Sequence, residues 1–196
     1  MILTFPRARL PTLPTAGCWA VSNFDFLHRP VWQARTDVEQ DETWVQPIPY
    51  LVMCDSKGRA WCYQRTGGDA RLEGRSSCGV GGHVDNTDAP EGEAFDADAT
   101  LRRALMRELA EELSVTATDL QVLRRRGLIF EGHSPVGRVH LGVLYSAQWI
   151  SCNPPEPQAN EALKSIGFMP LAAIAADTQF ELWSRLAAQY LLDAAA

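Results

Sequence analysis

The residues best placed to carry chemistry are three glutamates in one predicted helix, Glu108, Glu111 and Glu112. The surrounding run TLRRALMRELAEELSV (100–115) has a leucine at every fourth position, which predicts an amphipathic helix with one apolar stripe. Glu108 and Glu112 project onto that stripe instead of the wet face, and Glu111 sits beside them. Carboxylates on a packed face are costly unless something compensates them. A hard divalent cation such as Mg²⁺, which takes oxygen ligands, would do so.

A Gly-Gly sequence upstream of this helix gives the pattern its resemblance to a known family. RELAEE (107–112) resembles the helical core of the Nudix box, which reads Arg-Glu-apolar-any-Glu-Glu. The segment GGHV (81–84) resembles the turn that opens the box, and Val115 matches the apolar residue that closes it. A plain surface helix with a glutamate cluster is the alternative. It explains neither the Gly-Gly turn nor carboxylates on the leucine face.

The outer frame of the box departs from the family pattern. Gly82 and Arg107 are 25 positions apart, a longer gap than in the family, so NTDAPEGEAFDA (86–97) is interpreted as an inserted acidic loop. Counted back from Arg107, the family's upstream Glu falls on Ala99. The loop offers two candidate substitutes, Glu91 and Glu93.

The end of the helix departs from the pattern as well. The family's late Gly falls on Ser114, and a serine adopts the left-handed conformation of a helix end less readily than glycine. The run RLEGRSSCGVGGHVDNTD (71–88) resembles a little-characterised bacterial subgroup of predicted MutT/Nudix phosphoesterases that shares the long gap. These changes affect the frame of the box and leave its three glutamates intact.

The predicted elements fit the fold that the resemblance implies, an α/β/α sandwich around a mixed β-sheet. Strands are predicted at 50–54, 60–65, 76–84, 120–130, 138–150 and 166–169. Helices are predicted at 100–115, with Asp98 as N-cap, at 171–176 and at 180–192. EGHSPVG (131–137) is predicted as a turn. We expect a Nudix domain over 47–196 and an N-terminal extension over 1–46 that packs on it and is irregular up to residue 30.

The resemblance implies a hydrolase that cleaves a phosphoanhydride bond in a nucleoside diphosphate derivative or a similar small molecule. One or more Mg²⁺ or Mn²⁺ ions would activate the attacking water and clamp phosphate oxygens. Glu108, Glu111 and Glu112 would be the metal ligands, with Glu111 also catalytic. Arg107 would orient the box carboxylates through ion pairs, and its alternative role is a surface pair with Glu111.

Four further residues are candidates for the site near the box. Gly81 and Gly82 would let the backbone approach the metal or the substrate, although an ordinary strand-end turn is the alternative. His83 would face the pocket, although a lone histidine is more often satisfied by a neighbour. Glu161 stands where many family members carry a general base, and an exposed loop glutamate is its alternative.

Several residues farther from the box are weaker candidates. Glu181 is a rival for the general base, but with Thr178 it matches a capping box, which explains it structurally. Arginine suits bidentate contacts to phosphate. The candidates for such contacts are Arg71 and Arg75 and, with less support, the cluster Arg124, Arg125 and Arg126.

Composition narrows the class of protein. The chain has 196 residues, a net charge of −6 and a pI near 5.2, which argues against general nucleic-acid binding. No apolar run approaches the length of a membrane helix, and the N-terminus lacks the unbroken apolar region of a signal peptide, so we expect a cytoplasmic protein. The family makes a homodimer a possibility.

Two other functions compete with the hydrolase. Ala99 and Ser114 keep open a catalytically silent Nudix-fold module that binds a nucleotide or metabolite. A Nudix relative that isomerises a prenyl diphosphate would use a cysteine and a glutamate, and Cys78 precedes the Gly-Gly turn. No matching motif surrounds that cysteine.

Overall fold

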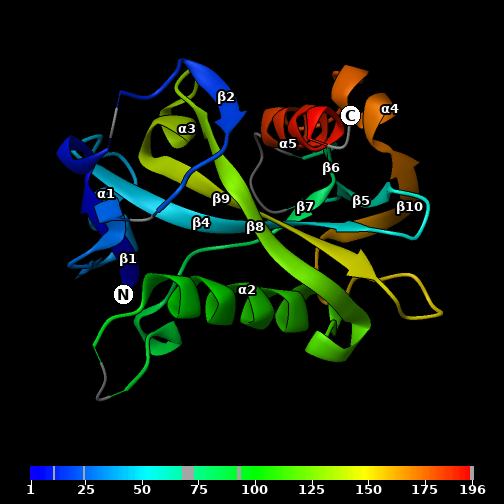
Figure 1. The fold of residues 1–196 in the computed structure, drawn as a ribbon, viewed down its shortest axis with the longest axis horizontal. Helices are drawn as coiled ribbons and strands as arrows, with labels where there is room; N and C mark the ends of the chain where they lie inside the picture. The colour runs from blue at the N-terminus through cyan, green and yellow to red at the C-terminus, as the bar shows by residue number, and fades with distance from the viewer. Residues whose placement is uncertain (11, 24, 68–72, 92–93, 195–196) are drawn as a thin grey trace.

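A mixed β-sheet runs through the middle of the molecule, with helices on both of its faces (Figure 1). The computed structural model describes residues 1–194 apart from 11, 24, 68–72 and 92–93. Within these residues one sheet joins ten strands: β1 (Ile2–Pro6), β2 (Ala16–Trp19), β3 (Val31–Gln33), β4 (Trp44–Cys54), β5 (Arg59–Arg65), β6 (Ser76–Ser77), β7 (Gly79–Val80), β8 (Leu120–Glu131), β9 (His140–Trp149) and β10 (Leu163–Pro170).

The helices form the outer layers of the sandwich. They are α1 (Arg35–Val38), α2 (Ala97–Leu113), α3 (Pro135–Val139), α4 (Leu171–Ala176) and α5 (Leu182–Asp193), with 3₁₀ turns at Arg7–Arg9, Asp25–Leu27, Asn86–Asp88 and Ala117–Asp119. Helix α2 covers one face, and α4 and α5 cover the other (Figure 1). The predicted α/β/α architecture is therefore confirmed. None of the helices among the described residues is long and apolar enough to cross a membrane.

The centre of the sheet is built from β4, β5 and β9. The main path of strands is β10-β5-β4-β9-β8-β2, with β4 and β9 parallel and the other neighbours antiparallel. Strand β4 is buried along nearly its whole length, as its apolar sequence requires of a central strand. The predicted hairpin of β4 and β5 is confirmed. Its turn is held by Asp55, which accepts bonds from the backbone amides of Lys57 and Arg59, both at 2.9 Å.

Helix α2 packs its leucine stripe on the sheet, as the periodicity predicts. The stripe is fully buried or nearly so: Leu101, Leu105, Leu109 and Leu113. The predicted N-cap is wrong, because Asp96 and not Asp98 accepts a bond from the Ala99 amide, at 3.0 Å. Asp98 instead binds the guanidinium groups of Arg102 and Arg125. Ser114 ends the helix in the left-handed conformation, with φ 55°.

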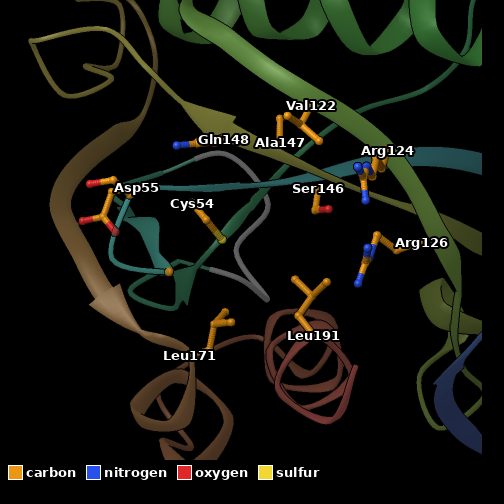
Figure 2. A pocket seen from close by; sticks show the side chains of 12 residues that line it. Cys54, Asp55, Val122, Arg124, Arg126, Ser146, Ala147, Gln148, Leu171 and Leu191 are labelled. Atoms are coloured by element: carbon orange, nitrogen blue, oxygen red, sulfur yellow. The ribbon is translucent and has the colours of Figure 1, made fainter. Parts of the chain in front are cut away.

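The opposite face carries the C-terminal layer. Phe180, Ala187 and Leu191 are buried against the sheet, as the predicted apolar face of the last helix requires. The predicted capping box is wrong: Glu181 makes no cap bond and pairs instead with Arg65 at 2.7 Å. A cavity of about 390 Å³ remains between this layer and the sheet, with Arg124, Arg126 and Leu191 at its wall (Figure 2).

Two segments contain more structure than predicted. The first 30 residues are not irregular, because β1 pairs with β3 and β4 and β2 extends the sheet along β8. The predicted turn at 131–137 runs into helix α3, where the Ser134 hydroxyl accepts a bond from the Gly137 amide and a proline occupies the first turn. The division of the chain at residue 46 stays a prediction.

Candidate active site

A cavity of about 430 Å³ lies where the Gly-Gly turn meets helix α2. Three parts of the chain line it. Helix α2 contributes Glu108 and Glu112, the turn contributes Gly81, Gly82, His83 and Asp85, and the N-terminal region contributes Met1, Ile2 and Arg35. The structure thus brings five of the predicted site residues to one place.

The two glycines of the turn are required by close approach. A Cβ on Gly81 would lie 1.8 Å from the Pro49 carbonyl oxygen of β4. A Cβ on Gly82 would lie 2.4 Å from the Glu108 carboxylate. The turn can therefore press against the sheet on one side and place its backbone beside a box carboxylate on the other, which a side chain would prevent.

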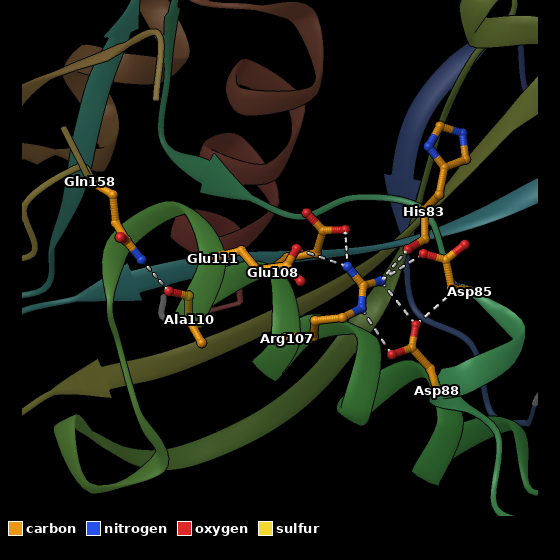
Figure 3. A network of polar contacts seen from close by, with 8 residues as sticks. All are labelled: His83, Asp85, Asp88, Arg107, Glu108, Ala110, Glu111 and Gln158. Atoms are coloured by element: carbon orange, nitrogen blue, oxygen red, sulfur yellow. Dashed lines mark hydrogen bonds and ion pairs between the residues drawn. The ribbon is translucent and has the colours of Figure 1, made fainter. Parts of the chain in front are cut away.

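Arg107 ties the turn to the helix (Figure 3). Its guanidinium donates to both carboxylate oxygens of Asp88 at 3.0 Å, to Glu108 at 2.8 Å and to Glu111 at 3.2 Å. It also donates to the carbonyl of His83 at 2.9 Å. The geometry supports the predicted positioning role, because the surface pair with Glu111 is only the longest of these contacts. A planar fork of donors is suited to such a network.

Asp88 is the acid that sequence reasoning placed elsewhere. Its side chain is 5% exposed, and its two oxygens hold Arg107 in a bidentate pair. Counting backward from Arg107 stays within helix α2 and reaches Ala99, whereas the same family spacing counted forward from Gly82, on the other side of the inserted loop, reaches position 88. The aspartate therefore precedes the insertion. Glu91 lies on an exposed turn, and Glu93 lies outside the described residues.

Glu108 and Glu112 form the electrostatic centre of the cavity. Burial raises the pKa of Glu112 to about 7, and the neighbouring charge of Glu108 adds to this. Burial also raises the pKa of Glu108, against the opposing effect of Arg107. Two half-buried carboxylates that repel each other are the chemistry that a divalent cation relieves. These two residues therefore fit a cation.

Glu111 lies apart from the other two glutamates. Its side chain is 59% exposed and is turned toward Arg107. Among the residues that the structure describes, no three His, Cys, Asp or Glu side chains are grouped closely enough to hold a metal ion as they stand. The three-glutamate ligand set stays a prediction, with Glu108 and Glu112 as the pair that the geometry brings together.

His83 faces the cavity as predicted and is held by neighbours on its other side. Its Nε2 lies 2.9 Å from Gln46 Oε1 and 3.2 Å from His140 Nε2. Burial lowers the pKa of His83 to about 3, with smaller effects from His140 and Arg35. The ring is neutral at physiological pH, so it can exchange hydrogen bonds but adds no positive charge.

The loop that carries Glu161 is fixed to the end of helix α2. The Gln158 side chain donates to the Ala110 carbonyl at 2.7 Å (Figure 3), and its backbone amide donates to the Glu112 carbonyl at 2.8 Å. The Glu161 amide in turn bonds to the Gln158 carbonyl at 2.9 Å. The charge of Glu161 contributes to the raised pKa of Glu112. The predicted general base is thus near the site, although it does not line the cavity.

The arginines predicted to bind phosphate lie in different parts of the structure. Arg75 donates to the Thr178 carbonyl at 2.6 Å and does not line the cavity, and Arg71 lies outside the described residues. Arg125 points to helix α2, while Arg124 and Arg126 lie on the opposite face of the sheet. An arginine that does line the cavity, Arg35, comes from the N-terminal region. Nothing in its local sequence marks it, because only the pairing of β1 and β3 with the sheet brings it there.

Cys78 lies in the core beneath α5 and away from the box. It is 1% exposed, and burial raises the pKa of its thiol well above the usual range. Its Sγ donates to the Ser184 carbonyl at 3.7 Å. A thiol held protonated in an apolar core does not serve proton transfer to a substrate, which argues against the isomerase alternative.

Comparison with known proteins gives a consistent result. A family model described as NUDIX domain matches residues 45–190. The protein YmaB of Bacillus subtilis is 39% identical over 116 residues, which are 58% of this chain and 54% of YmaB, so the aligned part spans about half of that relative.

Solved structures extend the similarity to nearly the whole chain. Tm1382, a candidate Nudix hydrolase, superposes with a TM-score of 0.76 at 26% identity and covers 98% of both chains. The NUDIX domain of Shewanella oneidensis NrtR in complex with ADP ribose has a TM-score of 0.56 at 15% identity and covers 78% of this chain and 89% of its own. At that identity the second likeness concerns the fold alone.

Proposed function

The chain belongs to the NUDIX family, and we propose that it is a Nudix-type hydrolase that cleaves a phosphoanhydride bond in a nucleoside diphosphate derivative with the help of Mg²⁺ or Mn²⁺. One observation carries the proposal. Glu108 and Glu112 share one cavity with raised pKa values, and the cationic Arg35 lies in the wall of the same cavity. Paired acids for a metal and a guanidinium for a phosphate are the parts that such a reaction needs.

The cation would be held by Glu108 and Glu112, with Glu111 as the further predicted ligand. When bound, it would lower the pKa of a water and neutralise phosphate charge. Arg107 holds the Glu108 carboxylate in place and, through Asp88, fixes the turn that carries Gly82. The chain's own contribution is therefore a rigid frame that holds two mutually repelling acids in one cavity.

The substrate would lie between helix α2 and the N-terminal region. The Arg35 guanidinium would bind a phosphate oxygen, since arginine forms paired hydrogen bonds with phosphate. The neutral His83 ring would exchange a hydrogen bond with an uncharged part of the substrate. Glu161, at the edge of the site, would take the proton of the attacking water. ADP-ribose belongs in the substrate panel, because a domain with this fold binds it.

The test is a substrate panel with Mg²⁺ or Mn²⁺. It spans nucleoside triphosphates, dinucleoside polyphosphates, nucleotide sugars, NADH, ADP-ribose and coenzyme A, with phosphate and pyrophosphate release both scored. We expect metal-dependent cleavage by wild type and a loss of about a hundredfold or more in Glu112→Gln. Glu91→Gln, at an exposed turn of the inserted loop, is the matched control and should keep wild-type turnover.

The panel also decides the role of Glu111. A Glu111→Gln variant as slow as Glu112→Gln supports three metal ligands, whereas wild-type turnover limits the site to the pair that lines the cavity. Equal turnover of wild type and Glu112→Gln on a cleaved compound would reject the proposed site. Absence of cleavage, with a compound still raising the melting temperature, would replace the hydrolase by the silent binding module.

A further inference from the structure

Two arginines line the cavity beneath α5, on the side of the sheet opposite the box. Arg124 and Arg126 line this cavity of about 390 Å³ (Figure 2). Neither guanidinium has an ion-pair or hydrogen-bond partner among the described residues. The acid that lines the same cavity, Asp55, is engaged by the Arg59 guanidinium at 2.7 Å and by two turn amides. The positive charge of the arginine pair is therefore not neutralised.

The strand holds the two arginines on this face by a strained backbone. Strand β8 has register shifts between Gln121 and Arg124 and between Arg125 and Gly127, so one bulge precedes Arg124 and Arg126 lies in the second. Val122 lines the cavity and has φ 57°, a left-handed conformation that a β-branched residue rarely adopts. Bulges of this kind re-aim side chains near functional sites, and strain kept at a site points to a role there.

Neutral donors complete one wall of the cavity. Ser146 is the cross-strand partner of Arg124 on β9, and Gln148 follows two positions later on the same face. Helix α5 is fixed above them, because the Tyr190 hydroxyl donates to the Arg126 carbonyl at 2.9 Å. Guanidinium, hydroxyl and amide groups in one wall all bind phosphate oxygens.

The opposite wall is apolar and suits a flat organic group. Leu171 and Leu191 contribute to it from α4 and α5. A volume near 390 Å³ lies within the range of small-molecule sites, roughly 300–1,000 Å³. Val122, which is 49% exposed, and the exposed Arg124 line the cavity at the edge of β8, so it can be reached from solvent there. We infer that the cavity beneath α5 is a second binding site, separate from the box, for a nucleoside diphosphate or a similar phosphate ester.

The test uses ADP as the probe, in EDTA and at low ionic strength, with isothermal titration calorimetry on the full chain. Without a divalent cation the acids of the box repel phosphate, so binding reports on the second site. We expect saturable binding that Arg124→Gln/Arg126→Gln weakens at least tenfold. The control Arg29→Gln/Arg103→Gln removes the same charge from two exposed arginines elsewhere and should leave the affinity within a factor of two.

Each outcome of the titration has one meaning. If Arg124→Gln/Arg126→Gln and the control double variant weaken ADP binding equally, the effect comes from net charge and the site is overturned. Absence of saturable ADP binding by wild type would overturn it as well. Tighter binding by Glu112→Gln, as expected where a repelling carboxylate is removed beside the ligand, would place ADP at the box and also overturn the second site. The unliganded melting temperature checks folding, and Arg124→Gln alone, at an exposed position, keeps the test open if the double variant does not fold. No turnover is measured, so the result is independent of the proposed hydrolysis.

Discussion

The two faces of the sheet use arginine in opposite ways. On the α2 face, the Arg107 guanidinium donates hydrogen bonds to Asp88, Glu108, Glu111 and a backbone carbonyl. On the α5 face, Arg124 and Arg126 face a cavity without partners among the described residues. A guanidinium whose donors are satisfied within the protein can position other groups but has little left for a ligand. The guanidinium groups of Arg124 and Arg126 do not hold other parts of the described structure in place, so they remain available to bind a ligand.

The largest effect should come from breaking the satisfied arginine. Arg107→Gln would leave Asp88, which is 5% exposed, as an unpaired buried carboxylate. We expect the free energy of unfolding to fall by about 3 kcal/mol, the lower end for a broken buried pair. Urea unfolding at pH 7.5 measures it. Arg103→Gln, exposed on the same helix, should stay within about 0.5 kcal/mol of wild type.

A second variant sharpens the interpretation of that loss. Removing both partners costs less than removing one, because no buried charge is left alone. Arg107→Gln/Asp88→Asn should therefore recover part of the stability that Arg107→Gln loses. A double variant less stable than the single one would contradict the assignment of Asp88 as the main partner.

A smaller effect should appear when pH changes the charge of the cavity. The folded pKa of Glu112 is raised to about 7 from an ordinary value near 4.5, so the folded state binds the proton more tightly than the unfolded chain. Its contribution to stability is then complete below pH 4.5 and is lost as pH rises through 7. In EDTA, Glu112→Gln should match wild type at pH 4 and exceed it by about 2 kcal/mol at pH 8, less than the roughly 3 kcal/mol that this pKa difference corresponds to, because solvent partly screens the carboxylate.

The measurement is urea unfolding of both proteins across that range in EDTA. The difference between them isolates Glu112 from His83, whose lowered pKa acts in the opposite direction, since stability held by a neutral histidine is lost as pH falls below about 6.5. If the difference in free energy of unfolding between Glu112→Gln and wild type does not grow with pH, burial does not raise the pKa of Glu112. That result would remove the electrostatic argument for a cation at the box.

The α2 face was more predictable from the sequence than the α5 face, for a physical reason. The leucine period, the Gly-Gly turn and the glutamate spacing are local signals, and helix geometry converts them directly into positions. The helix and the hairpin followed from these patterns, whereas the pairing of Arg107 with Asp88 did not. Asp98 failed as a cap because two acids stand within three positions, and the amide of Ala99 lies within reach of Asp96.

Residues placed by long-range pairing left no such local signal. Arg35 reaches the box only because the N-terminal strands join the sheet. The first 30 residues were predicted to be irregular, so this pairing was not expected. Glu181 matched a capping box in sequence, yet Arg65, 116 positions away, takes its carboxylate. The division of Arg124, Arg125 and Arg126 between two faces follows from strand alternation and two bulges, and bulges are not readable from composition.

The smallest effect should come from two residues with left-handed backbone conformations, one on each face of the sheet. Ser114 and Val122 both have left-handed backbones, but Ser114 only ends a helix, whereas Val122 lines the second cavity. Ser114→Gly should raise the free energy of unfolding by about 0.5–1 kcal/mol, because glycine adopts this conformation without a Cβ clash. Ser114→Ala keeps the Cβ and should gain nothing, and a gain equal to that of glycine would locate the effect in the side chain.

Val122→Asn should also stabilise the fold, since asparagine tolerates this backbone. Only the change at Val122 should alter ADP binding in EDTA, because only there does the strain border a ligand cavity.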